Sequence, residues 1–237
     1  MENSSFGRLI GVLVAPGKTF RSIAERPTWA VALLVLLIAS AAIGFVTAQR
    51  TDYRDVITQS VREKGRDVPE AQLEPQIEMM EKAGPAISAV GAPVVVAVIT
   101  LIVALLYWVA FKLLGSDFSY KSGLSVTLHA SMPAVMSLLL SIPVILSKES
   151  IGYTDMKRSG GGTFLQSNLA FLAPEDAPSW LTALLASLDF FSLWGLVLSV
   201  IGFRAVSGKP TRSVAITVIA IWLILVAIRV GWVAIFG

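Results

Sequence analysis

Five long apolar stretches dominate this chain and limit what it can fold into. They cover residues 29–48, 92–114, 123–146, 180–203 and 213–236. A helix rises about 1.5 Å per residue, so each stretch is long enough to cross about 30 Å of hydrocarbon. The chain is 55% hydrophobic and 15% charged, whereas soluble domains have about 25% charged residues. The sequence therefore predicts an all-α polytopic membrane protein with five transmembrane helices.

The charged residues between these stretches predict the orientation of the chain. The N-terminal segment and the loops after the second and fourth stretches together carry a net charge of about +6, by a count of their side chains. The other two loops carry about −3 by the same count. By the positive-inside rule, the N-terminus is cytoplasmic and the C-terminus is outside. Because the basic residues flank apolar spans, they predict membrane topology and no binding of nucleic acid.

Residues 1–28 form a cytoplasmic segment ahead of the first span. Phe6, Leu9, Ile10 and Leu13 follow helical spacing, and basic residues come after them. Such a helix is typical of the interface of an anionic leaflet, although the same apolar stripe could dock a partner protein. Contact with anionic lipid is predicted for five basic residues on this side: Lys18, Arg21, Arg204, Lys209 and Arg212.

The two loops predicted to lie outside cover about residues 49–91 and 147–179. The first contains a helix-start signal at Asp67 and Pro69 and a stop signal at Gly84-Pro85. Between these signals, Leu73, Ile77 and Met80 fall on one helical face. We expect a small helical cap on the outer surface; the alternative is a solvated acidic connector.

Two opposite charges lie within the last two apolar stretches. Asp189 and Arg229 are predicted at similar depths from the outer side, on antiparallel neighbouring helices. A charge at the centre of a span costs about 2.5–3.5 kcal/mol, which pairing would reduce. One interpretation is a structural ion pair. In a second, either residue lines a polar cavity for an ion, a proton or a lipid headgroup. In a third, Arg229 extends outward to the interface and Asp189 meets water or a backbone donor.

The third apolar stretch has a possible polar kink site at His129 and Pro133. A proline inside a helix removes a hydrogen bond and bends the helix, so Pro133 and Pro143 predict a kinked span. His129 could titrate or coordinate a ligand. It could equally serve a structural hydrogen bond at the kink.

The residues needed for catalysis are largely missing. The chain has no cysteine and one histidine, and it contains neither a Gly-x-Ser-x-Gly motif nor a histidine–glutamate pair at metal-ligand spacing. The Gly-Lys-Pro-Thr sequence at residues 208–211 lacks the upstream glycine of a phosphate-binding loop. We therefore expect a protein that is not an enzyme and that has no cofactor and no metal.

Three longer segments carry a resemblance to a known family. They are "VLVAPGKTFRSIAERP" before the first span, "GSDFSYKSGLSVTLHASMPAV" leading into the third, and "LDFFSLWGLVLSVIGFRAVSGKPTRSVAI" across the last pair. In order and spacing, the chain resembles the bacterial branch of the Yip family of multi-span membrane proteins. The resemblance implies a five-helix membrane domain with a cytoplasmic N-terminus. Eukaryotic Yip proteins associate with small prenylated GTPases, but this chain lacks the long N-terminal region that they use.

Two functions remain open from the sequence. The first is a non-enzymatic adaptor or assembly factor of a bacterial cytoplasmic membrane, which presents its extramembrane segments to lipids and to a protein partner or a second copy. The second is a small permease, or a membrane subunit of a transport complex, that moves an ion or a lipid. The kinked third span, Asp189, Arg229 and His129 are the features that favour transport.

Overall fold

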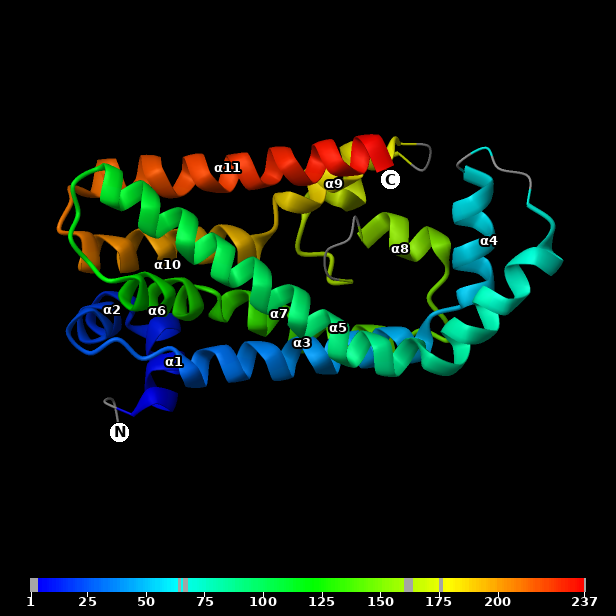
Figure 1. Cartoon of the computed structure of the whole chain (residues 1–237), viewed down its shortest axis with the longest axis horizontal. Helices are drawn as coiled ribbons and strands as arrows, with labels where there is room; N and C mark the ends of the chain where they lie inside the picture. The colour runs from blue at the N-terminus through cyan, green and yellow to red at the C-terminus, as the bar shows by residue number, and fades with distance from the viewer. Residues whose placement is uncertain (1–3, 64, 66–67, 160–163, 175–176, 237) are drawn as a thin grey trace.

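Five membrane-spanning helices form the body of the protein, as the sequence predicted. The computed structural model describes residues 4–63, 65, 68–159, 164–174 and 177–236. The spans are α3 (Ala30–Arg50), α5 (Glu70–Leu113), the pair α6 (Tyr120–Ala130) and α7 (Met132–Leu146), α10 (Phe190–Ser207) and α11 (Thr211–Phe236). They run side by side along the long axis of the molecule (Figure 1). The described residues outside them also form helices, so the protein is all-α.

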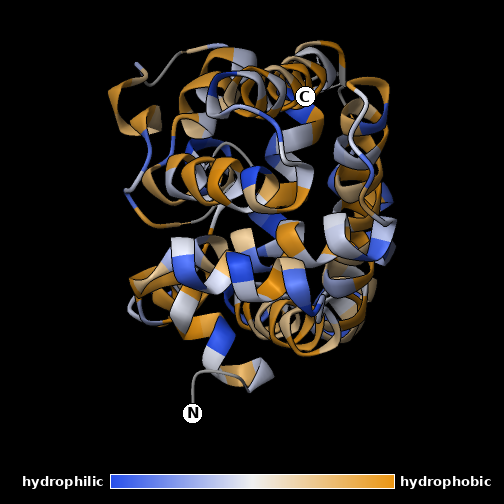
Figure 2. Cartoon of the chain, turned by 90° about the vertical axis from the view of Figure 1, so that its left-hand side faces the viewer, coloured by the Kyte–Doolittle hydropathy of each residue, from blue (hydrophilic) through white to orange (hydrophobic). Residues whose placement is uncertain are grey.

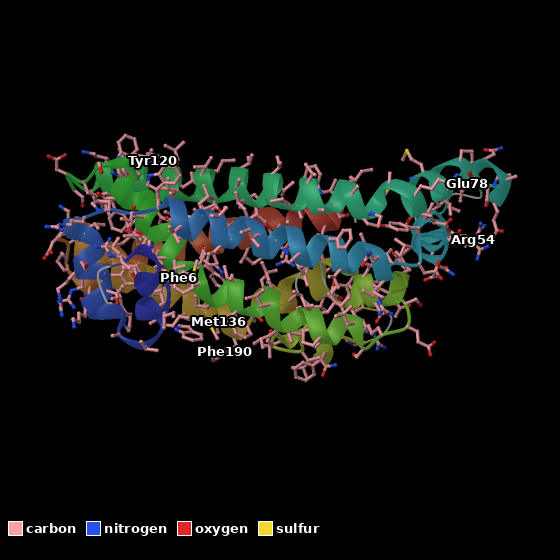
Figure 3. The ribbon with its side chains drawn as sticks, turned by 90° about the horizontal axis from the view of Figure 1, so that it is seen from below. Phe6, Arg54, Glu78, Tyr120, Met136 and Phe190 are labelled. Atoms are coloured by element: carbon pink, nitrogen blue, oxygen red, sulfur yellow. The ribbon has the colours of Figure 1, made fainter. Side chains whose placement is uncertain are left out.

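The shorter helices gather at the two ends of this bundle. The N-terminal end carries α1 (Ser5–Val14), α2 (Pro16–Glu25), the α5–α6 loop and the α10–α11 loop (Figure 1). The opposite end, here called the cap end, carries α4 (Tyr53–Glu63), α8 (Tyr153–Ser159), the 3₁₀ turn η1 (Leu169–Leu172) and α9 (Ser179–Ser187). Figure 3 shows Tyr120 toward one end of the molecule and Arg54 and Glu78 at the other.

Helix α6 lies at the centre of the bundle although it is rich in polar residues. Its residues from Ser122 to Ala130 are all buried, and α1, α2, α3, α5 and α10 contact it. Hydroxyl groups in lipid need partners within the protein. Those of Ser125 and Thr127 donate to the carbonyls of Lys121 and Gly123, at 2.8 and 3.0 Å. The helix therefore satisfies its own polar side chains, and the surrounding helices shield it from lipid.

Helix α10 and the N-terminal helix α2 pack against α6 through Gly202. A Cβ atom added at Gly202 would lie 2.6 Å from Cγ1 of Val126 and 2.8 Å from the ring of Phe20. Both of these side chains are fully buried. Next to them the ring of Phe203 stacks on that of Phe111, with ring centroids 5.1 Å apart. Residues of α1 and α2 are thus part of the same hydrophobic core as the spans.

The predicted apolar stripe of the N-terminal segment divides between core and surface. Leu9 is buried in the core with Val12, whereas Phe6 and Ile10 are 63% and 55% exposed. Leu13 packs at the margin of the core. The division arises because α1 and α2 form a hairpin whose inner face covers the ends of α6 and α10. Figure 2 looks onto this end, where hydrophilic stretches interrupt the hydrophobic helices.

Helix α5 is much longer than a membrane span. Its 44 residues correspond to about 66 Å at 1.5 Å per residue. The predicted stop at Gly84-Pro85 is wrong, because the helix continues through Pro75, Pro85 and Pro93. Packing compensates for the hydrogen bonds that the prolines remove. Gly84 lies against the ring of Tyr53 on α4, where a Cβ would come within 2.3 Å of the hydroxyl oxygen.

The cap is formed by α4 and the first four turns of α5. Leu73 and Ile77 are buried against Ile57 of α4, and Met80 packs beside them, which confirms the predicted apolar face. Asp67 of the predicted helix start lies outside the described residues, and α5 begins at Glu70. Arg54 donates two hydrogen bonds to the Glu74 carboxylate, at 3.0 and 2.6 Å. These hydrogen bonds hold the pKa of Glu74 below its usual value.

The orientation predicted from the loop charges can be tested at the two ends of α5. The natural chain has no cysteine. Met79 in the cap is 54% exposed, and the Asp117 side chain after α5 is fully exposed. We expect a membrane-impermeant maleimide to label Met79→Cys in spheroplasts and Asp117→Cys only in inverted vesicles. The reverse labelling pattern would contradict a cytoplasmic N-terminal end.

Candidate functional site

Asp189 begins a helix and does not lie within one. The sequence predicted one continuous span over residues 180–203, but the structure divides it into α9, which ends at Ser187, and α10, which begins at Phe190. Oδ1 of Asp189 accepts a hydrogen bond from the Ser192 backbone N–H at 3.0 Å, as in a helix N-cap. Oδ2 accepts a hydrogen bond from the Ser167 hydroxyl. The carboxylate is therefore a structural cap at the boundary of the span.

A loop at residues 164–168 meets this helix break. The Phe190 N–H donates to the Ser167 carbonyl at 2.9 Å, and Asn168 and Asp189 form an isolated antiparallel bridge. Asn168 is buried, and its side chain caps η1 by accepting from the Ala170 N–H at 2.9 Å. No local pattern predicts this pairing, because the partners are more than 20 residues apart and the loop has no regular pattern.

Arg229 lies close to the same helix break. It is 18 residues after Thr211, or about 27 Å along α11, and therefore near the cap-end boundary of the span. Its Nη1 donates to the Ser187 hydroxyl at 3.3 Å. The structure thus brings Arg229 and Asp189 to one junction. It does not join them directly: among the described residues, no ion pair connects the two side chains, and Asp189 bonds to Ser167 and Ser192 instead.

The predicted kink site coincides with the break between α6 and α7. Ser131 ends α6 and precedes α7, and Pro133 occupies the first turn of α7, where a proline is tolerated. Pro143, in contrast, lies inside α7, which continues to Leu146. His129 is 1% exposed, and its Nδ1 donates to the Ser125 carbonyl at 2.8 Å. This geometry gives His129 a structural hydrogen bond within its own helix.

The five residues predicted to contact anionic lipid lie together at the N-terminal end. Two are on α2, one is near the end of α10, and two are on or beside the α10–α11 loop. Lys209 is partly exposed. The other four are exposed: Lys18, Arg21, Arg204 and Arg212. The structure therefore brings them to one end of the bundle, and contact with lipid stays a prediction.

A buried arginine at the N-terminal end was missed by the sequence analysis. Arg8 is only 4% exposed. Its guanidinium donates to the Arg26 carbonyl at 2.7 Å and to the hydroxyls of Thr28 and Ser22 at 3.0 Å each. These bonds fasten α1 to the end of α2 and to the start of the first span. The available signal was its position beside Leu9 on the apolar side of α1.

The cap end contains two adjoining cavities. The larger, of about 980 Å³, lies among α7, α8, η1 and α9, and Lys148, Lys157 and Arg158 are among the residues that line it. The smaller, of about 680 Å³, lies among α3, α4, α5, α7 and α8 and is mostly apolar. Both volumes are in the range of small-molecule sites. Sequence reasoning missed both cavities, because each is formed by residues from distant parts of the chain.

Backbone hydrogen bonds hold the elements around these cavities together. The Ile151 N–H donates to the Arg50 carbonyl at 2.7 Å, and the Asp52 N–H donates to the Ile151 carbonyl at 2.9 Å. The Tyr153 N–H donates to Oδ2 of Asp55 at 2.7 Å. The end of α3 and the start of α4 are thereby joined to the segment that leads into α8.

Comparison with known proteins assigns the whole arrangement to a family. A model of the Yip1 domain matches residues 10–233. The chain belongs to the Yip1 domain family. It is similar to the membrane protein YknW of Bacillus subtilis, with 27% identity over 221 residues that cover 92% of this chain and 86% of that protein. No solved structure matches.

The Yip1 match includes every feature described above except the first residues of α1. The α9–α10 break, the arginine at residue 229, the cap and both cavities all fall between residues 10 and 233. The resemblance read from the three sequence segments is therefore confirmed. The family assignment establishes a membrane protein with this domain, and it assigns no chemistry to any of these residues.

The capping role of Asp189 predicts different effects for two substitutions. Asp189→Ala should lower stability by about 1 kcal/mol, because the Ser192 N–H loses its acceptor. Thermal unfolding in mild detergent should show a midpoint about 2–4 °C lower for a chain of this size. Asp189→Asn should stay close to wild type, because its amide oxygen still caps α10. If Asp189→Asn loses as much as Asp189→Ala, the negative charge is required and a direct pairing with Arg229 is favoured.

Proposed function

We propose that this protein is a non-catalytic adaptor or assembly factor of a bacterial cytoplasmic membrane. It presents the cap on one side of the membrane and the α1–α2 hairpin on the other to protein partners and lipids. The observation that carries the proposal is helix α5, which is a membrane span and the main helix of the cap at once. A protein bound to the cap is thereby connected rigidly to the membrane domain.

The packing of the cap supports a role as a fixed docking surface. Its own small core contains Ile57, Leu73 and Ile77. The Arg54–Glu74 pair and the contact of Tyr53 with Gly84 add connections between α4 and α5. These contacts leave an outer surface that includes the exposed residues Glu78, Met79 and Glu81. An ordered, charged surface with an exposed methionine is suited to a protein partner.

The N-terminal end supports membrane contact beside the docking role. Phe6, Ile10 and Val14 are exposed on α1 at intervals of four residues, while the opposite face of α1 is buried. Figure 3 labels Phe6 beside the N-terminal ribbon. Exposed apolar residues near a group of basic side chains are typical of an anionic leaflet surface. The hairpin thus combines a face fixed to the bundle with a face directed to lipid or to a partner.

Transport is the second candidate, and the discontinuous helix formed by α9 and α10 favours it. Broken helices form the substrate sites of many transporters, where the break lies near the bilayer midplane. Here the break at Asp189 lies at the cap-end boundary of α10. The other break, at Ser131 in the middle of the third span, follows the buried helix α6, and the Ser131 hydroxyl donates to the Thr127 carbonyl of that helix. The position of the break at Asp189 therefore favours the adaptor over a permease.

In-membrane photocrosslinking tests the adaptor proposal. A photoreactive amino acid would replace Met79 in the cap, or Ile10 on α1, in cells that express the full chain. Ile219, which is 45% exposed near the middle of α11, serves as the matched lipid-facing control. We expect discrete protein adducts from the position at residue 79 or residue 10, at yields well above those from residue 219.

Adducts no more abundant at residues 79 and 10 than at residue 219 would contradict the adaptor proposal. Uptake of a labelled ion or lipid into vesicles that contain only the purified chain would favour the transport candidate instead. Adducts between two copies of this chain would identify the partner as a second copy, which supports a docking role for the labelled surface.

A further inference from the structure

The two cavities at the cap end differ in chemistry and share a wall. The larger one, called here the basic chamber, and the smaller one, called the apolar chamber, are both lined by Ser159 and Phe164. Figure 1 shows α8, which carries Ser159, between α4 and α9 at this end. The shared residues make the chambers neighbours.

The basic chamber has the features of an anion site. Among the described residues that line it are three basic side chains, Lys148, Lys157 and Arg158, and one acidic side chain, Asp155. With Glu63, which pairs with Lys157, the balance of these described side chains is +1. Lys148 is held by Asp155 at 2.5 Å, and Lys157 is held by Glu63 at 2.5 Å. Because an ammonium group has three donors, each lysine held in this way still has hydrogen atoms to offer a phosphate.

The apolar chamber has the features of a site for a hydrocarbon chain. Its lining includes Ile43, Met80, Ile87 and Leu138, together with small residues such as Gly91. The chamber lies where α3 ends at Arg50 and where α7 approaches its end at Leu146, which is the boundary between span and cap. A Cβ added at Gly91 would meet no atom within 4 Å, so open space adjoins the helix there.

Exposed apolar side chains flank the basic chamber. Phe171 and Leu172 at the end of η1 are 62% and 61% exposed, and Phe171 also lines the chamber. Side chains of this kind beside a bilayer boundary enter the headgroup region. Phe171 is thus both an exposed apolar side chain of the kind that contacts lipid and part of the chamber lining.

We propose that the two chambers together bind one anionic phospholipid. Its phosphate lies in the basic chamber near Lys148 and Lys157, and one of its acyl chains lies in the apolar chamber beside Gly91. The site does not depend on the adaptor role, because its occupant is a lipid of the surrounding leaflet. It is also distinct from the basic residues at the N-terminal end, which lie at the opposite end of the bundle.

Photolabelling with synthetic lipids tests this site on the full purified chain. The chain would be reconstituted in phosphatidylcholine vesicles that contain a trace of phosphatidylglycerol with a diazirine in its acyl chain. Mass spectrometry would locate the adducts. We expect preferential labelling of peptides around residues 88–92 and 138–141. The matching phosphatidylcholine probe should label them about tenfold less, because its choline cation offsets the phosphate charge and is repelled by the basic side chains.

Two pairs of matched variants separate the chambers. Gly91→Leu places a side chain in the open space of the apolar chamber and should reduce labelling there about tenfold, as expected for a lost chain contact. Gly231→Leu is the control, because Gly231 of α11 also has open space around it but does not line either chamber. Lys157→Gln should remove much of the preference for phosphatidylglycerol. Its control is Lys82→Gln, which breaks an exposed ion pair with Glu78 away from the site.

Three results would overturn the proposal. The first is uniform labelling of all lipid-facing helices by both probes. The second is labelling near residue 91 that is unchanged in Gly91→Leu. The third is displacement by soluble glycerol phosphate at concentrations no higher than those at which short-chain phosphatidylglycerol displaces the probe, which would show that the site takes a headgroup phosphate alone and has no use for the apolar chamber. Circular dichroism of each variant confirms that a loss of labelling does not reflect unfolding.

Discussion

The burial of a polar helix at the centre of a lipid-surrounded bundle determines most of this structure. Helix α6 contains serine, threonine and histidine side chains that bond to its own carbonyls, because no water is available in the hydrocarbon layer. The neighbouring helices must then approach closely to keep lipid away from it. Gly202 provides this approach for α10, and Phe20 of α2 fills the space beside it. The N-terminal hairpin is consequently part of the core, although most of it lies outside the spans.

The two ends of the bundle follow from the same requirement for satisfied polar groups. At the cap end, the fourth apolar stretch is interrupted between α9 and α10, and the Asp189 carboxylate caps the start of α10. Its charge therefore lies at the boundary of the span. At the N-terminal end, Arg8 is buried but has carbonyl and hydroxyl acceptors from α2 and the segment before α3. The Asp189 carboxylate and the Nη groups of Arg8 are thus bonded to uncharged partners.

The sequence was informative where a signal is local and repeated. Span number, helical class and the Leu73–Ile77–Met80 face follow from runs and spacings, and the structure confirms them. Prediction from the sequence failed where contacts between distant residues determine the local structure. Gly84-Pro85 looked like a stop, but α5 continues through both residues, and Gly84 lies against the ring of Tyr53. Likewise, the Ser167 loop that meets Asp189 and the two chambers require residues that are far apart in the sequence, so hydropathy and charge could not reveal them.

The central claim is that close packing against α6 holds the N-terminal helices and α10 in one bundle. The most direct test compares the thermal unfolding midpoints of two glycine-to-alanine variants in the same detergent. Gly231→Ala on open helix surface should keep or raise the midpoint, since alanine favours a helix by about 0.5–1 kcal/mol. Gly202→Ala should lower it by several degrees, roughly as expected for about 1–3 kcal/mol of overpacking against Val126 and Phe20. A midpoint for Gly202→Ala that is raised as much as that of Gly231→Ala would contradict the claim.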